Sequence, residues 1–177
     1  MIVVFAWGIL LVSFGKIMAS TTPTALPTST SVDYFLAYPG ILPDHFLYPI
    51  KMVRDRIWLF LTTDNLKRAE TLLLFADKRL GTGKALIEKG KEKLGVSTLT
   101  KAEKYLERAI VQERVAHKNS EDTTAFLEKL LIATKKHEEI LVELQEKVSE
   151  DGKKAIEDML RYSRQGYEEV RRRLENN

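Results

Sequence analysis

After Pro49, apolar residues recur at intervals of three and four along the chain, which is the spacing of one face of an α-helix. No stretch of useful length alternates apolar and polar residues as a half-buried strand does. Breaks in the pattern predict five helices, at residues 49–62, 65–93, 101–117, 120–148 and 152–175. Short connections favour antiparallel neighbours. The expected fold class is all-α, an elongated antiparallel helical bundle with coiled-coil-like packing.

The first predicted helix is short and amphipathic. Its apolar face is expected to carry Leu47, Ile50, Val53, Ile57, Phe60 and Leu61. Its polar residues Lys51, Arg54 and Asp55 are expected to face away from that side. The pattern therefore predicts one apolar and one charged face for this helix.

The second predicted helix has an apolar seam, a line of apolar residues along one face, on which large residues alternate with alanine or glycine. The seam comprises Leu66, Ala69, Leu73, Ala76, Leu80, Gly83, Ile87, Gly90 and Leu94. Its small side chains let a partner helix approach closely. We predict a break at residues 95–100, because Thr100 and Glu103 match a capping box at the start of the third helix.

The chain begins with an apolar run, and Lys16 is its first charged residue. This length suits the apolar region of a secretory signal and is short for a full membrane span. We predict a signal peptide or membrane anchor at 1–19, a Ser/Thr/Pro-rich linker at 20–33 and a helical domain at 34–177. The expected location is extracytoplasmic, with the protein either secreted or anchored in a membrane through residues 1–19 if these are not cleaved. The alternative is a buried N-terminal helix of the domain.

Residues 34–49 form a lead-in rich in aromatic residues and proline, which favours extended backbone. Seven of the fifteen aromatic residues lie between Tyr34 and Phe60. Two interpretations stay open: the segment packs over one end of the helices, or it forms a groove for a protein partner or for self-association. The candidate partner-binding residues are Tyr38, Phe46, Tyr48 and Trp58.

Composition narrows the function only slightly. Hydrophobic residues make up 44% and charged residues 30%, which is enough for a core. The net charge of +3 and the interleaving of basic with acidic residues give no reason to expect nucleic-acid binding. The chain has no cysteine, which excludes disulfides, thiolate nucleophiles and zinc fingers.

Metal-ligand spacing is absent around the three histidines, since neither Glu-x-x-His nor His-Glu-x-x-His occurs. Asp44, His45 and His117 are weak metal candidates. His137 falls on an apolar stripe and is expected to be a hydrogen-bonded residue at the edge of the core. Adjacent carboxylates such as Glu138 and Glu139 point apart on a helix, so no acid–base pair is expected. The sequence predicts no catalytic residue and no cofactor.

Three segments carry a resemblance to a known family: Tyr38 to His45 with Leu47 to Arg56, Lys67 to Arg79, and Ser97 to Tyr105. In these segments the chain resembles an uncharacterised bacterial family, domain of unknown function 5667, over roughly residues 34–110. The resemblance implies a leader or membrane segment before a helical domain. It implies no activity, so no catalytic residue is carried over.

The favoured function is a non-enzymatic extracytoplasmic helical module for protein interaction or envelope association. One alternative is a periplasmic-type metal or stress sensor that uses Asp44, His45 and His117. The other is an enzyme with dispersed carboxylates.

Overall fold

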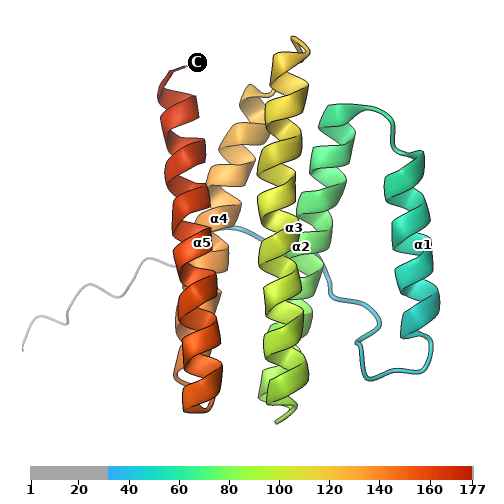
Figure 1. Cartoon of the computed structure of the whole chain (residues 1–177), viewed down its shortest axis with the longest axis vertical. Coiled ribbons are helices and arrows are strands. Elements are labelled where there is room, and N and C mark those ends of the chain that lie inside the picture. The colour runs from blue at the N-terminus through green and yellow to red at the C-terminus, as the bar shows by residue number, and fades with distance from the viewer. Residues whose placement is uncertain (1–31, 177) are drawn as a thin grey trace, which may run out of the picture. The chain divides into compact units, whose positions relative to one another are not determined.

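The computed structural model describes residues 32–176, which form five α-helices and no strand (Figure 1). The helices are α1 (Tyr48–Leu61), α2 (Asn65–Glu88), α3 (Glu92–Lys118), α4 (Thr124–Gln145) and α5 (Glu150–Glu175). The predicted all-α class is confirmed. The predicted signal or anchor lies outside the described residues, as does the predicted linker except for Val32 and Asp33. Between residues 32 and 176, no helix combines the length and the apolar character that crossing a bilayer requires.

Helices α2 to α5 lie side by side and bury a shared core, which confirms the predicted antiparallel bundle (Figure 1). The closest pairings are α2 with α3 and α4 with α5, and α1 contacts only α2 appreciably. One apolar cluster contains Leu72, Leu73, Phe75, Leu106, Ile110, Leu127, Leu130 and Val170. A second contains Leu80, Leu99, Ile140, Leu141, Leu144, Ile156 and Met159. The core therefore belongs mainly to α2–α5, and α1 stands at its edge and contributes Leu59.

Helix α2 ends earlier than the predicted range 65–93. Gly90 has a φ of +75°, the left-handed conformation that commonly follows a helix C-terminus. Its N–H donates to the carbonyl of Ile87 at 2.8 Å, and the N–H of Lys91 donates to that of Leu86 at 2.9 Å. The glycine that the seam placed inside the helix thus terminates it.

Helix α3 begins at Glu92, so the predicted break at 95–100 and the start at residue 101 were wrong. Thr100 lies inside α3, and its hydroxyl donates to the carbonyl of Val96 at 3.0 Å. A threonine can satisfy its hydroxyl in this way in a helix interior, so a capping-box spacing does not by itself mark a helix start. Glu103 is a buried residue of the same helix.

The glycines of the α2–α3 interface lie where the two backbones meet. A Cβ on Gly83 would stand 2.5 Å from Cδ2 of Leu99 and 3.2 Å from the carbonyl oxygen of Gly95. A Cβ on Gly95 would stand 2.6 Å from Cγ1 of Ile87. The predicted close approach at the small side of the seam is therefore present.

The other predicted boundaries, 49–62, 120–148 and 152–175, differ from the structure by at most four residues, and the predicted end at residue 175 is confirmed. Ser120, where the fourth helix was expected to begin, lies between α3 and α4 with a φ of +64°. Helix α5 starts at Glu150, before the predicted start at residue 152. Its cap is Ser149, whose Oγ accepts from the N–H of Gly152 at 3.4 Å.

The lead-in to α1 runs along the bundle, and hydrogen bonds fix it to α1, α2 and α4. The Tyr34 hydroxyl donates to Asp77 of α2 at 2.7 Å, and the N–H of Val32 donates to Glu139 of α4 at 3.0 Å. Nζ of Lys51 donates to the carbonyl of Pro39 at 3.1 Å. The lead-in is thus attached to α2 and α4 before the chain enters α1.

Candidate interaction surface

Helix α1 turns its apolar side away from the bundle. Six apolar residues of α1 are more than half exposed: Ile50, Val53, Ile57, Trp58, Phe60 and Leu61. Asp55 is only 4% exposed, and Lys51 is half-buried, so these two polar residues do not face solvent as the charged face was expected to. An amphipathic helix of a globular domain ordinarily packs its apolar stripe against the core. The exposed stripe of α1, which we call the α1 face, is therefore the unusual surface of this protein.

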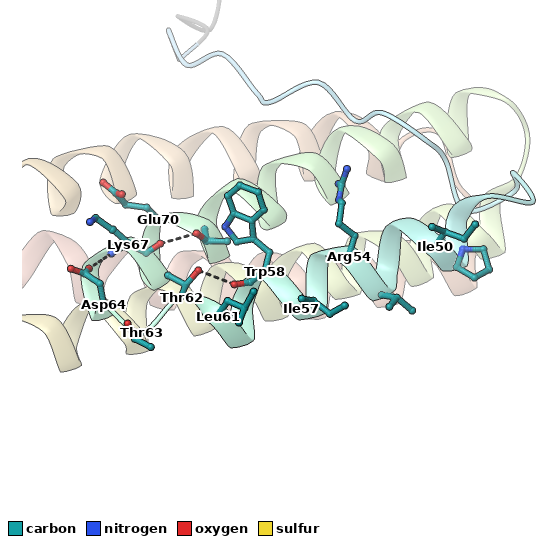
Figure 2. A pocket seen from close by; sticks show the side chains of 13 residues that line it. Ile50, Arg54, Ile57, Trp58, Leu61, Thr62, Thr63, Asp64, Lys67 and Glu70 are labelled. Carbon is teal, nitrogen blue, oxygen red and sulfur yellow. Dashed lines mark hydrogen bonds between the residues drawn. The ribbon is translucent and has the colours of Figure 1, made fainter.

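A groove opens along the α1 face. It has a volume of about 1120 Å³ and is lined by α1, by the turn that follows it and by the first turns of α2. Figure 2 shows Trp58 and Arg54 projecting on one side of α1, and Ile57 and Leu61 on the other. Asp64, at the α2 end, accepts from the N–H of Lys67 at 2.8 Å and so caps α2. The remainder of the groove is mainly apolar.

A second hollow, of about 460 Å³, lies beside the groove and is lined by arginines. Arg56 of α1, Arg68 of α2 and Arg108 of α3 converge on it, together with Tyr105 and Phe60. Val53 and Ile57 line both the hollow and the groove, so the two form one continuous surface. We call this hollow the arginine hollow.

The arginines of this hollow have no acidic partner in the described part of the chain. Across residues 32–176, Arg56, Arg68 and Arg108 form no ion pair within 4 Å, whereas the exposed arginines of α5 such as Arg161 and Arg171 do. Arg68 donates to the carbonyl of Leu59 at 3.2 Å. The local excess of positive charge is therefore available to an anionic ligand.

A fourth arginine, Arg79 of α2, lies underneath and is 5% exposed. Its guanidinium stands 4.1 Å from the ring centre of Tyr105, donates to the carbonyl of Phe75 at 3.2 Å and contacts Sδ of Met52 at 3.5 Å. The contacts of Arg79 thus connect α1 to α2 and α3 through polar and aromatic interactions instead of a large apolar interface.

The structure separates the predicted partner-binding residues. Trp58 lines the groove and is 62% exposed. Tyr38 and Phe46 are also exposed but lie in the lead-in, outside the groove. Tyr48 is half-buried at the start of α1. The apolar α1 residues of the surface were missing from the predicted set, because they had been read as an ordinary amphipathic stripe.

The predicted metal candidates do not come together. Asp44 pairs with Lys91, just before α3, at 2.7 Å, and Nδ1 of neighbouring His45 accepts from the N–H of Leu47 at 3.2 Å. His117 is in the last turn of α3, a helix about 40 Å long at 1.5 Å per residue. Within residues 32–176, no three metal-binding side chains are grouped.

A buried polar chain crosses the bundle behind the lead-in. His137 of α4 is fully buried, with Nδ1 2.8 Å from Glu103 of α3 and Nε2 3.2 Å from Asp77 of α2. Tyr34 completes the chain through the other oxygen of Asp77. His137 was expected at the edge of the core, and it lies at its centre instead.

The surroundings of His137 favour its protonated form. Burial alone lowers the pKa of the His137 imidazole, but the charge of Glu103 and the hydrogen bonds that the ring donates to both carboxylates outweigh burial and raise the pKa to about 9. Burial, and then the charge of Asp77, raises the pKa of the Tyr34 phenol, which therefore stays protonated and donates. The two carboxylates, the imidazolium and the phenol satisfy one another in the interior.

Comparison with known proteins gives one match. A family model described as "Domain of unknown function (DUF5667)" matches residues 40–162. The resemblance noted in the sequence is thus confirmed, and the match extends it through α4 into α5. No curated protein and no solved structure matches the chain significantly.

Proposed function

The chain belongs to the DUF5667 family, and on that premise we propose that it is a non-enzymatic, envelope-associated helical module that lies outside the cytoplasm and binds a partner through the α1 face. The observation that carries the proposal is the exposure of Ile50, Val53 and Ile57 beside a groove of about 1120 Å³. Contiguous exposed apolar patches mark interaction sites, and covering one such side chain contributes about 1.5–3 kcal/mol.

The placement of the acidic and basic groups favours binding over catalysis. His137 with its two carboxylates is the arrangement that acid–base chemistry would use, but it is fully buried and its ring nitrogens are both engaged. The α1 face, in contrast, offers apolar side chains and arginines, with Asp64, Lys67 and Glu70 at the α2 end of the groove. A surface of that composition is suited to recognition.

The proposed location follows from the apolar start of the chain and the Ser/Thr/Pro-rich stretch behind it. The chain has no cysteine, so Ser97→Cys, at an exposed position of α3, introduces a single thiol. A membrane-impermeant maleimide should label that thiol in intact bacterial spheroplasts that express the full chain. The control is the same variant without residues 1–19, which should react only after lysis. Labelling of the full chain only after lysis contradicts the proposed location.

The role of the α1 face is tested by a photo-crosslinking amino acid at Ile57 in the full chain. Irradiation in the envelope should give a discrete adduct, with protein or with lipid. The matched control carries the crosslinker at Tyr162, which is 57% exposed on α5 and outside the groove. No adduct at Ile57, or equal adducts at both positions, contradicts binding through α1.

A further inference from the structure

We propose that the partner of the α1 face is the surface of an anionic phospholipid bilayer, on which α1 lies flat with its apolar stripe among the acyl chains and the arginine hollow against lipid phosphates. This inference rests on the proposed function and deepens it, because it names the chemistry of the partner. It is carried by three features: the orientation of the stripe on α1, the position of the arginines around it and the tryptophan at its side.

The stripe has the geometry of an interfacial helix. Ile50, Val53, Ile57 and Leu61 are separated by three or four residues and are all exposed, so they project from one side of α1. The opposite side is fixed to the bundle by buried Asp55 and Leu59. Helices that lie in the membrane interface present such an apolar face to the acyl chains and carry basic residues beside it.

Basic residues flank the stripe on both sides. At 100° per residue, Arg54 and Arg56 fall on opposite flanks of the line through Ile57. Arg56 also belongs to the arginine hollow, where Arg68 and Arg108 come in from α2 and α3. Guanidinium groups bind phosphate in a bidentate manner, while their aliphatic stems cover apolar surface. Three helices thus present arginines at the edge of the apolar stripe, where lipid phosphates would lie.

Charge disfavours the alternative of a second copy of this chain. A symmetric contact through the α1 face would bring Arg56 of both copies together. Arg54 is already paired with Asp55 at 2.8 Å, and Asp55, the one carboxylate of α1, is 4% exposed and does not reach Arg56. An anionic bilayer offers phosphates without such repulsion. Trp58 adds an amphipathic ring of the kind that is enriched at membrane interfaces.

The test uses the full chain with Trp7→Phe, which leaves Trp58 as the single tryptophan. The protein is reconstituted in vesicles of phosphatidylglycerol or phosphatidylcholine with brominated acyl chains, which quench tryptophan at membrane depth. Trp58 should be quenched in phosphatidylglycerol and much less in phosphatidylcholine. The matched control combines Trp7→Phe and Trp58→Phe with Tyr162→Trp on α5, and its fluorescence should be the same in both lipids.

The arginines are tested in the same vesicles. Arg56→Gln and Arg108→Gln should each lower the ratio of docked to undocked Trp58 about five-fold, since one basic residue near an anionic surface contributes roughly that factor. Arg172 is an exposed arginine of α5 that likewise pairs with no carboxylate among residues 32–176 and donates only to a backbone carbonyl. Arg172→Gln should leave the ratio unchanged. Circular dichroism checks that all variants keep their helical content.

The outcomes separate this inference from the proposed function. Quenching that depends on phosphatidylglycerol and on Arg56 and Arg108 supports both. Absent quenching, or equal quenching in the two lipids, overturns the bilayer as partner. If crosslinking at Ile57 then captures a second copy or another protein, the proposed function stands without a lipid partner. If crosslinking also fails, both are wrong.

Discussion

Nδ1 of His137 lies 2.8 Å from a carboxylate oxygen of Glu103, and neither side chain is appreciably exposed. Asp77 holds the other ring nitrogen at 3.2 Å. An imidazolium between two carboxylates in a helical core makes stability depend on pH.

The free energy of unfolding should fall as the pH rises from about 6.5 to above 9. The pKa of His137 is about 9 in the fold, above its ordinary value of 6.5, so the folded state holds this proton more tightly than the unfolded state. The resulting stabilisation is complete below pH 6.5 and is lost as the pH rises through 9, by up to about 3 kcal/mol. Urea unfolding at pH 6, 7.5 and 9.5 measures it. In His137→Gln the slope over this range should be absent; an unchanged slope contradicts the assignment.

Tyr34→Phe should lower the free energy of unfolding by about 1–3 kcal/mol, because it leaves an oxygen of buried Asp77 without its donor. Chemical denaturation at pH 7 measures the change. Tyr38→Phe is the control, since Tyr38 is 83% exposed, and it should alter stability by less than about 0.5 kcal/mol. Equal effects of the two changes would mean that the lead-in does not contribute to the fold.

Gly83→Ala should destabilise the fold by about 1–3 kcal/mol, because the new Cβ would meet Leu99 at 2.5 Å and the backbone of Gly95 at 3.2 Å. Gly166→Ala is the contrast. There the new Cβ meets only the terminal methyl of Ile110 at 2.9 Å and Thr134 at 4.0 Å, and alanine is the better helix former by about 1 kcal/mol. That variant should be neutral or stabilising. Thermal unfolding of both variants measures the difference in stability. An unchanged unfolding temperature in Gly83→Ala would disprove the tight α2–α3 contact.

Arg173→Met should cost about 3–5 kcal/mol, because it leaves Glu113 as an unpaired carboxylate with no exposure. Arg171→Met, which removes exposed ion pairs with Glu168 and Glu175 on α5, should cost less than about 1 kcal/mol. Denaturant titration of the two variants side by side gives the comparison. Similar losses would show that Glu113 finds another partner or becomes protonated.

Ile57→Ser should leave the free energy of unfolding within about 0.5 kcal/mol of the parent, because Ile57 is 52% exposed and contributes little to the core. The same change should abolish association through the α1 face. Leu59→Ser, on the buried side of α1, should instead unfold or detach the helix. Denaturation and vesicle quenching of the same samples separate the two effects. A large loss of stability in Ile57→Ser would mean that the α1 face is part of the core.

Hydrophobic spacing was sufficient to predict five helices, although not the boundary between α2 and α3, since apolar residues that share a helix face recur at intervals of three and four whatever covers that face. It could not predict what covers the face. Ile50, Val53 and Ile57 were recognised as one stripe, but only the structure shows that the bundle contacts the other side of α1, through Asp55 and Leu59. That orientation depends on Arg79 and Tyr105, which lie on helices distant in sequence.

The buried polar chain likewise could not be predicted from the sequence, because its residues come from segments that meet only in the fold. His137 was placed on an apolar stripe, but Glu103 was assigned to a cap, and nothing local linked Tyr34 to Asp77. Four segments of the chain must fold before these residues meet. The left-handed Gly90, in contrast, was a local signal, and its place in the seam concealed it.

The attachment of the lead-in at Val32 and Tyr34 has a mechanical consequence. Tension applied to the chain from its N-terminal side would act first on the hydrogen bonds that Val32 and Tyr34 make to Glu139 of α4 and Asp77 of α2, because Val32 and Tyr34 precede α1. Helix α1 lies outside this load path. The exposed side of α1 would therefore keep its shape and accessibility while these two hydrogen bonds bear the load.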